Sequence, residues 1–254
     1  MSNADSNKHK ILSDNLFPVV GIGASAGGLD AFKKLLKAIP ENSGMAYILV
    51  QHLHPQHESA LPEILQSVTK IPVEQISDNV KVKPDHIYVI PANKILVATD
   101  GVLKLSARSV VSSKNLPIDI FFTSLAEVHQ AQAIGVVLSG NGADGTEGLK
   151  EIKARGGLTF AQDPASAAND SMPRHVIDAA VVDFILPPEK IPEKLMELKQ
   201  SSASSSTGEY SLKDKANENA FKEIIALLRL HVGADFTHYK QTNSQAHHTP
   251  HGNS

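Results

Sequence analysis

The stretch GIGASAGG, residues 21–28, decides the fold, because it joins a short apolar run to a segment of helical periodicity. The run 18–22 before it is β-branched and predicts a buried strand, and residues 29–39 after it repeat apolar side chains on one helical face. The glycine spacing fits G-x-S-x-G centred on Ser25, a turn that presents a nucleophilic serine above a strand end. The helix that follows would offer free N–H groups to a developing oxyanion.

The same letters fit the fingerprint of a dinucleotide-binding turn, through Gly21, Gly23 and Ala26. That kind of site expects an acidic residue about 20 positions further on, at the end of the second strand, to bind the ribose. Gln51 and His52 stand there instead. A glycine-rich turn that only packs closely is a third interpretation. The fingerprint alone therefore leaves a hydrolase, a nucleotide-binding protein and a plain turn open.

Apolar runs and helical segments alternate along the chain to about residue 200. Buried strands are predicted at 45–50, 133–138, 158–161 and 181–185, and helices at 57–68, 117–130 and 146–155. The runs 94–99 and 102–105 flank Asp100-Gly101, which indicates a β-hairpin. The pattern predicts an α/β fold, a doubly wound, mostly parallel sheet with helices on both faces and a local antiparallel hairpin.

Composition excludes several classes of protein. The 254 residues carry 24 Lys+Arg against 27 Asp+Glu, so the net charge of -3 gives no electrostatic reason to expect nucleic acid as a partner. Cysteine is absent, which excludes a disulfide scaffold and thiolate chemistry. The polar start lacks a signal peptide's apolar core, and no apolar stretch approaches the roughly 20 residues of a membrane span. We therefore expect a cytoplasmic protein that does not insert into a membrane.

Three histidines follow the second predicted strand. A lone histidine in the place of His52 is more often a hydrogen-bonded structural residue than a catalytic base. Together, His52, His54 and His57 resemble the metal cluster of metallo-β-lactamase-type hydrolases, although Gln56 stands where those enzymes carry an aspartate. A metal-dependent hydrolase that uses these histidines is one alternative.

Asp144 lies in the loop after the predicted strand 133–138. In isolation, an Asp-Gly pair there indicates a turn or a helix cap. Ser25, His52 and Asp144, however, each follow a different predicted strand, and parallel strands place their carboxyl ends at one edge of the sheet. This convergence supplies a nucleophile, a base and a group that orients the base. Their order in the chain differs from the Ser, Asp, His order of α/β-hydrolases, so a serine hydrolase of another fold family is predicted.

An ordered set of short motifs resembles the catalytic domain of the chemotaxis protein-glutamate methylesterase family, CheB. The motifs are GASAGG at 23–28, QH at 51–52, IP at 90–91, PID at 117–119, GNGADG at 140–145, AQ at 161–162 and MPR at 172–174. The resemblance implies that Ser25 is the nucleophile, His52 the general base and Asp144 the orienting aspartate. It also implies that the backbone N–H groups of Ala26 and Asn141 form the oxyanion hole.

The resemblance further implies the reaction and its setting. Members of the family hydrolyse glutamate methyl esters on the cytoplasmic helices of chemoreceptors during chemotactic adaptation, release methanol, and can also deamidate receptor glutamines. No metal or organic cofactor is required. Asn141 stands where methionine is usual and Ala26 where threonine is frequent, changes that leave the backbone donors in place. A noncatalytic docking module of the same fold is the alternative to an enzyme.

Four segments are expected along the chain. Residues 1–16 are a disordered tail, 17–198 the methylesterase catalytic domain, 199–216 a Ser-rich linker, and 217–254 a helix followed by a disordered tail. A typical family member begins with a receiver domain, whereas about 18 residues precede the first predicted strand here. Residues 217–240 resemble the opening helix of the partner methyltransferase family, CheR. This resemblance predicts the start of a fused methyltransferase domain, and such a domain as a partner.

Overall fold

The computed structural model describes residues 17–51, 60–107 and 116–204. Their strands and helices are, in order, β1 (Val19–Ala24), α1 (Gly28–Ala38), β2 (Ala46–Gln51), α2 (Leu61–Gln66), β3 (Val73–Gln75), β4 (Val80–Lys81), β5 (His86–Val89), β6 (Lys94–Thr99), β7 (Val102–Ala107), α3 (Pro117–His129), β8 (Ala133–Val137), α4 (Thr146–Ala154), β9 (Leu158–Gln162), α5 (Ser171–Asp178), β10 (Phe184–Leu186) and α6 (Ile191–Ser204). Short 3-10 helices lie at η1 (Gln130–Gln132), η2 (Pro164–Ser166) and η3 (Pro188–Lys190). Among the described helices, none combines the length and the apolar character that a membrane crossing needs.

Seven strands form the main sheet in the order β10-β9-β8-β1-β2-β5-β3, and every neighbouring pair is parallel. β1 is the central strand, so the chain winds outward from it in both directions. The register pairs Val19 with Ala46 of β2 and with Ala133 of β8, which aligns the three strands at their amino ends. The doubly wound parallel sheet expected from the sequence is confirmed, and its switch point is β1.

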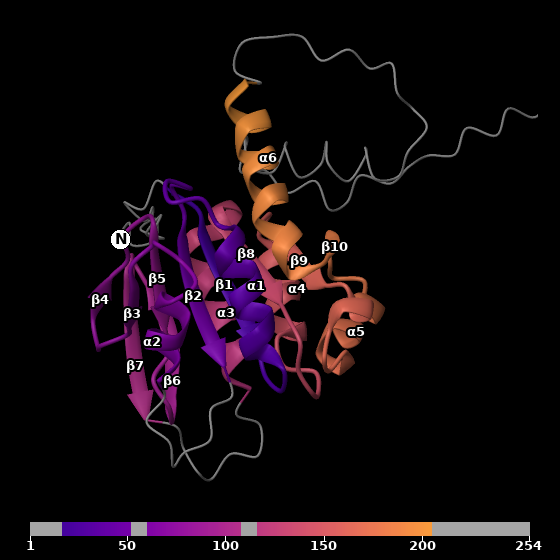
Figure 1. Cartoon of the computed structure of the whole chain (residues 1–254), viewed down its shortest axis with the longest axis horizontal. Helices are drawn as coiled ribbons and strands as arrows, with labels where there is room; N and C mark the ends of the chain where they lie inside the picture. Colours follow the sequence, from indigo (N-terminus) through magenta and orange to yellow (C-terminus); the bar gives the residue numbers. More distant parts are fainter. Residues whose placement is uncertain (1–16, 52–59, 108–115, 205–254) are drawn as a thin grey trace, which may run out of the picture.

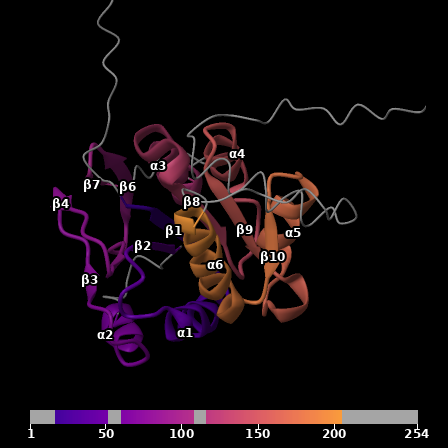
Figure 2. The same cartoon turned by 90° about the horizontal axis from the view of Figure 1, so that it is seen from above.

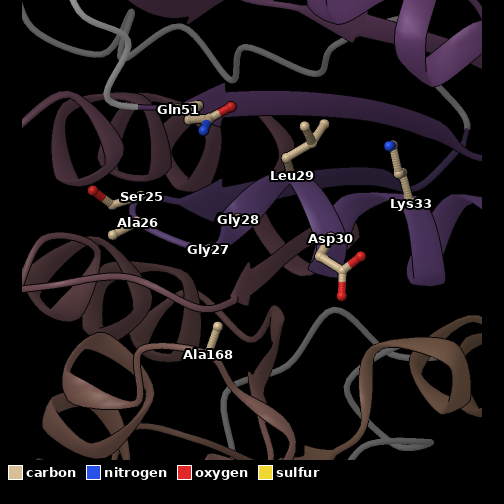
Figure 3. Close-up of a pocket in the computed structure, with 9 residues that line it drawn as sticks. All are labelled: Ser25, Ala26, Gly27, Gly28, Leu29, Asp30, Lys33, Gln51 and Ala168. Atoms are coloured by element: carbon tan, nitrogen blue, oxygen red, sulfur yellow. The ribbon is translucent and has the colours of Figure 1, made fainter.

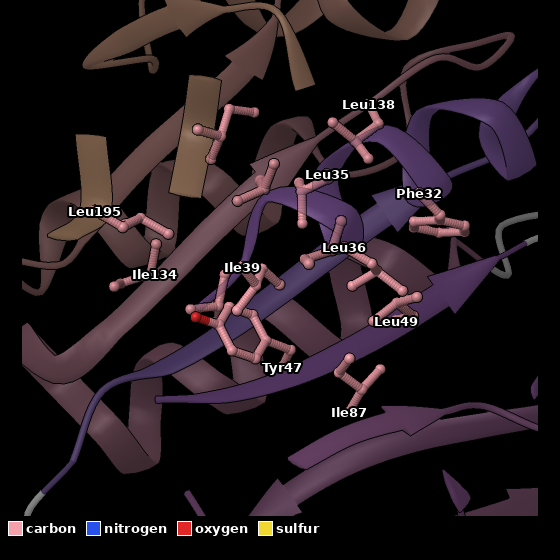
Figure 4. Packing of buried hydrophobic residues seen from close by; sticks show 14 of the residues in the cluster. Phe32, Leu35, Leu36, Ile39, Tyr47, Leu49, Ile87, Ile134, Leu138 and Leu195 are labelled. Atoms are coloured by element: carbon pink, nitrogen blue, oxygen red, sulfur yellow. The ribbon is translucent and has the colours of Figure 1, made fainter. Parts of the chain in front are cut away.

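Helices cover both faces of the sheet (Figures 1 and 2). Figure 2 shows α1, α2 and α6 on one face and α3 and α4 on the other. On the first face, Phe32, Leu35 and Leu36 of α1 lie over Tyr47 and Leu49 of β2 (Figure 4). All five side chains are almost completely buried. Because each such burial stabilises the fold by about 1.5–3 kcal/mol, this contact fixes α1, and the turn before it, on the sheet.

The predicted hairpin is confirmed, but it belongs to a second sheet. β6 and β7 pair antiparallel around Asp100-Gly101, with Thr99 opposite Val102, and β4 adds a third strand. This small sheet packs on α3, where the N–H of Ala98 donates to the Ser124 hydroxyl over 2.9 Å. Three strands were not predicted, because β3, β4 and β5 have two to four residues each and are too short for periodicity.

Three boundaries differ by three residues or more from those predicted. α2 begins at Leu61 instead of residue 57, and residues 57–59 lie outside the described part. β10 begins at Phe184 instead of residue 181. Before it, the chain turns at Ala180, which has a φ of 55°, and the Thr159 hydroxyl donates a hydrogen bond to the carbonyl of Val181 over 2.7 Å. α6 continues to Ser204, so residues 199–204, which were expected to begin the linker, are helical.

Glycines on β1 let α3 approach the sheet closely. A Cβ at Gly23 would lie 2.5 Å from Cγ2 of Ile118, and one at Gly21 would lie 2.9 Å from the rings of Phe121 and Phe122. Gly21 and Gly23, the two glycines of the dinucleotide fingerprint, therefore allow α3 to pack closely on β1. Close packing was one of the three interpretations of this stretch. The close contact brings the N-terminus of α3 to the carboxyl edge of the sheet.

Candidate active site

Ser25 follows β1 directly and begins a tight turn into α1. Its N–H donates to the carbonyl of Ser139 over 2.9 Å, and its carbonyl accepts from the N–H of Gly28 over 2.9 Å. Gly27 has a φ of 75°, a conformation that a residue with a side chain rarely adopts. The turn thus has the tight strand-to-helix geometry that G-x-S-x-G predicts, with Ser25 half-buried at its tip.

A pocket of about 550 Å³ opens beside this turn (Figure 3). It runs from Ser25 along the first turns of α1 and is bounded by the end of β2 and by the loop after β9. Its lining consists of Ser25, Ala26, Gly27, Gly28, Leu29, Asp30, Lys33, Gln51 and Ala168. The pocket lies at the carboxyl edge of the sheet, where doubly wound α/β folds bind their ligands.

The loop after β8 lies against the serine. A Cβ at Gly140 would be 2.9 Å from Cβ of Ser25 and would overlap Sδ of Met172. The N–H of Gly140 donates to the carbonyl of Asn169 over 2.9 Å, and the carbonyl of Gly140 accepts from the N–H of Met172 over 2.9 Å. Gly140 is therefore held between the Ser25 turn and α5, which places the start of the GNGADG segment beside Ser25.

The N–H groups of Ala26 and Asn141 make no hydrogen bond with any residue that the structure describes. The Ala26 N–H belongs to the same peptide as the Ser25 carbonyl. Because that carbonyl accepts from Gly28, the N–H must point away from α1. The Ser25 hydroxyl is likewise without a hydrogen bond in the described part of the chain. These groups are available to a substrate, and the oxyanion hole stays a prediction.

Asp144 is buried, with 2% of its surface exposed, and its carboxylate reaches the N-terminus of α3. Oδ2 accepts from the N–H of Ile118 over 3.1 Å, and Oδ1 accepts from the N–H of Asp119 over 2.9 Å. Both donors belong to the first turn of α3, whose positive dipole end stabilises a carboxylate. The side chain thus caps a helix other than the one it precedes, and its orientation is fixed.

Asp119 repeats this arrangement in the opposite direction. Its Oδ1 accepts from the N–H of Gly148, in the first turn of α4, over 2.8 Å. The pKa of Asp119 is raised to about 6. Burial is the main cause and the negative charge of Asp144 adds to it, whereas the hydrogen bond from Gly148 acts in the opposite direction. Each of the two aspartates therefore caps the helix that begins beside the other.

The raised pKa of Asp119 predicts a pH-dependent contribution to stability. Because this pKa lies above 3.8, the ordinary value of an aspartate, the folded state binds an extra proton between about pH 4 and pH 6. Stability therefore rises as pH falls through that window. Asp119→Asn lacks this gain, so its deficit relative to the wild type should grow from pH 7 to pH 4.5 in urea unfolding. The exposed Asp178 provides the control Asp178→Asn. An equal deficit of Asp119→Asn at both pH values would contradict the prediction.

Ser139 is fully buried and joins the loop after β8 to the Ser25 turn and to the loop after β9, both of which contribute to the pocket lining. Its hydroxyl donates to the carbonyl of Ala26 over 2.9 Å and accepts from the N–H of Asn169 over 3.0 Å. Its own N–H donates to Oε1 of Gln162 over 2.8 Å. Neither Ser139 nor Gln162 was among the predicted site residues. The available signal was a polar residue at, or directly after, the end of a buried strand.

Ser139→Ala should lower kcat by about tenfold or more, because the Ser25 turn loses its anchor. The Asn169 N–H loses its acceptor, which should also cost about 1–3 kcal/mol of stability. Ser124→Ala is the matched control. Ser124 is also buried and makes two hydrogen bonds, from Ala98 and to the Phe121 carbonyl, but it lies under the small sheet. Equal losses of kcat in the two variants at matched stability would refute a positioning role for Ser139.

The three histidines, His52, His54 and His57, lie outside the described residues. Gln51, which precedes them, ends β2, pairs with Ala24 and lines the pocket. No cluster of potential metal ligands occurs within the described ranges, which do not include these histidines. The general-base role of His52 and the metal-dependent alternative therefore both stay predictions.

A serine at a strand-to-helix turn, a buried carboxylate after the neighbouring strand and a pocket at the carboxyl edge define an α/β protein of the hydrolase class. The family model that matches the chain is CheB methylesterase, over residues 20–195. The chain belongs to this family, which favours the hydrolase interpretation of residues 21–28 over the nucleotide-binding one.

Individual relatives agree with this assignment. A protein from Leptospira interrogans is 34% identical over 187 residues, which are 73% of this chain and 97% of the relative. A protein-glutamate methylesterase/protein-glutamine glutaminase from Pseudomonas aeruginosa is 39% identical over 183 residues, and the chain spans 54% of its length. The crystal structure of the Thermotoga maritima CheB methylesterase catalytic domain matches with a TM-score of 0.66 at 32% identity, covering 72% of this chain and 98% of that one.

Proposed function

We propose that this chain hydrolyses glutamate methyl esters on the cytoplasmic helices of chemoreceptors, releases methanol and so acts in chemotactic adaptation. The observation that carries the proposal is the position of Ser25, on a tight strand-to-helix turn at the pocket of a protein in the CheB methylesterase family. Relatives are also named protein-glutamine glutaminases, so deamidation of receptor glutamines is proposed as a second reaction of the same site. Its setting is the cytoplasm, and the reaction uses no organic cofactor or metal.

Ser25, His52 and Asp144 divide the chemistry. His52 takes the proton of the Ser25 hydroxyl as its oxygen attacks the ester carbonyl. The N–H groups of Ala26 and Asn141 donate to the resulting oxyanion. Methanol leaves with the proton from His52, and an acyl-serine remains. Water then gives a proton to His52 and attacks the acyl carbon. The bond from that carbon to the Ser25 oxygen breaks, His52 returns the proton to this oxygen, and the glutamate side chain leaves as an acid.

Asp144 supplies the negative charge that the mechanism needs. An imidazole that accepts a proton becomes a cation, and a fixed carboxylate stabilises that cation and selects the tautomer that can act as a base. The two N–H donors of α3 hold the Asp144 carboxylate in one orientation. This support favours a catalytic role over the plain Asp-Gly turn.

A fluorophosphonate probe tests whether Ser25 is an activated nucleophile. We expect the wild type to be labelled once per chain, with the adduct on the peptide that contains Ser25. Ser67→Ala, which removes an exposed serine hydroxyl outside the pocket, should be labelled to the same extent. A wild type that is folded but not labelled would instead favour the noncatalytic docking module.

A further inference from the structure

The pocket extends well beyond the serine. Ser25 and Ala26 lie at one end, and Lys33 of α1 lies at the other (Figure 3). Lys33 is five residues beyond Gly28, or about 8 Å along the helix axis. A pocket of about 550 Å³ has room for a drug-sized ligand, more than a single ester side chain fills. The part near Lys33 is therefore left for another group of the substrate.

The two charged side chains that line the pocket, Asp30 and Lys33, differ in whether they have an ion-pair partner. Asp30 points to the opposite side of α1 from Leu29, Lys33 and Gln51 (Figure 3), and its carboxylate pairs with Lys34 at 3.4 Å. Lys33 is half-buried and has no ion-pair partner among the residues that the structure describes. Of the two charged side chains that line the pocket, Lys33 is the one without an ion-pair partner among the described residues, and its charge is positive.

The neighbouring polar group cannot neutralise this cation. Gln51 lies on the same side of the pocket as Lys33, with Leu29 between them (Figure 3). Its side chain is neutral, and its buried Oε1 has no hydrogen-bond partner in the described part of the chain. One wall of the pocket thus combines a neutral amide close to the serine with a cation further along α1.

We propose that Lys33 forms a carboxylate subsite, which binds an acidic side chain of the receptor near the ester that Ser25 attacks. The subsite rests on the proposed function, since it assigns a second contact to the same substrate. A receptor helix that lies along α1 would present its acidic side chains further along the pocket than the ester, on the side where Lys33 lies. The subsite selects esters in acidic surroundings and contributes to binding, not to bond breaking.

Lys33→Gln tests the subsite, because it keeps a polar side chain on the helix and removes only the charge. The substrates are a receptor fragment with one glutamate methyl ester and acidic neighbours, and the same fragment with these neighbours changed to glutamine. On the acidic fragment, Lys33→Gln should raise KM for methanol release about threefold to tenfold with kcat unchanged. On the neutral fragment, the wild type and the variant should have the same KM.

Lys37→Gln is the matched control, since Lys37 is an exposed lysine of the same helix that does not line the pocket. Its KM should equal that of the wild type on both fragments. An unchanged KM of Lys33→Gln on the acidic fragment would overturn the subsite, and so would an equal rise on both fragments. If the wild type released no methanol from either fragment, the proposed function itself would fail, and the subsite with it.

Discussion

Alanine in place of Ser25 should reduce methanol release by a factor of about 10⁴ to 10⁶, since the reaction loses its nucleophile. Folding should be almost unaffected, because backbone hydrogen bonds hold the turn. The N–H of Ser25 donates to the carbonyl of Ser139, and the carbonyl of Ser25 accepts from the N–H of Gly28. The unfolding free energy of Ser25→Ala should stay within about 0.5 kcal/mol of the wild type. Initial rates with the methylated fragment and urea unfolding of the same preparations check both expectations.

Ser67→Ala is the control for this variant. The Ser67 hydroxyl, on an exposed helix end, donates to the carbonyl of Ile64 over 2.7 Å and lies outside the pocket. Its rate should equal that of the wild type. Undiminished turnover by a folded Ser25→Ala protein would remove the whole catalytic assignment.

Asp144→Asn should lower kcat by about 10⁴, the loss that this change causes in a serine protease triad, with KM affected much less. An amide cannot stabilise an imidazolium ion, and it has one acceptor oxygen where the carboxylate has two. One of the N–H groups of Ile118 and Asp119 would therefore face an NH₂ group, which should also cost about 1–3 kcal/mol of stability.

Asp119→Asn separates the catalytic effect of Asp144 from the structural one. Asp119 is buried beside Asp144, but its Oδ1 accepts from Gly148 in the first turn of α4, whereas Asp144 accepts from the first turn of α3. At temperatures where both variants are folded, we expect kcat of Asp119→Asn to be within about tenfold of the wild type. A loss of only a few-fold in Asp144→Asn would reduce Asp144 to a helix cap.

The sequence was sufficient for the central elements of the fold. Long, uniformly apolar runs predicted β1, β2 and β8, and helical periodicity predicted α1, α3 and α4 with boundaries close to those observed. Because parallel strands end at one edge, the same pattern predicted that Ser25 and Asp144 would lie at that edge. The structure adds that the strands they follow, β1 and β8, are neighbours. The family resemblance carried by the short motifs is confirmed by the match over residues 20–195.

Contacts between elements could not be predicted, because they leave no local signal in the sequence. The bonds from Ile118 and Asp119 to Asp144 join residues about 25 positions apart, and they exist only because glycines on β1 let α3 approach. The role of Ser139 depends likewise on three loops that only the folded chain brings together. The strands β3, β4 and β5 were missed for a different reason, since their few residues gain their stability from neighbours in the sheets.

Methanol release from a receptor fragment that carries glutamate methyl esters tests the central claim most directly. The assay compares the wild type, with and without EDTA, with Ser25→Ala, and mass spectrometry of the fragment follows the loss of each methyl group. We predict one methanol for each ester lost, at rates that EDTA does not change and that Ser25→Ala abolishes. Loss of activity in EDTA would favour the metal site of His52, His54 and His57. A folded wild type that releases no more methanol than Ser25→Ala would contradict the account.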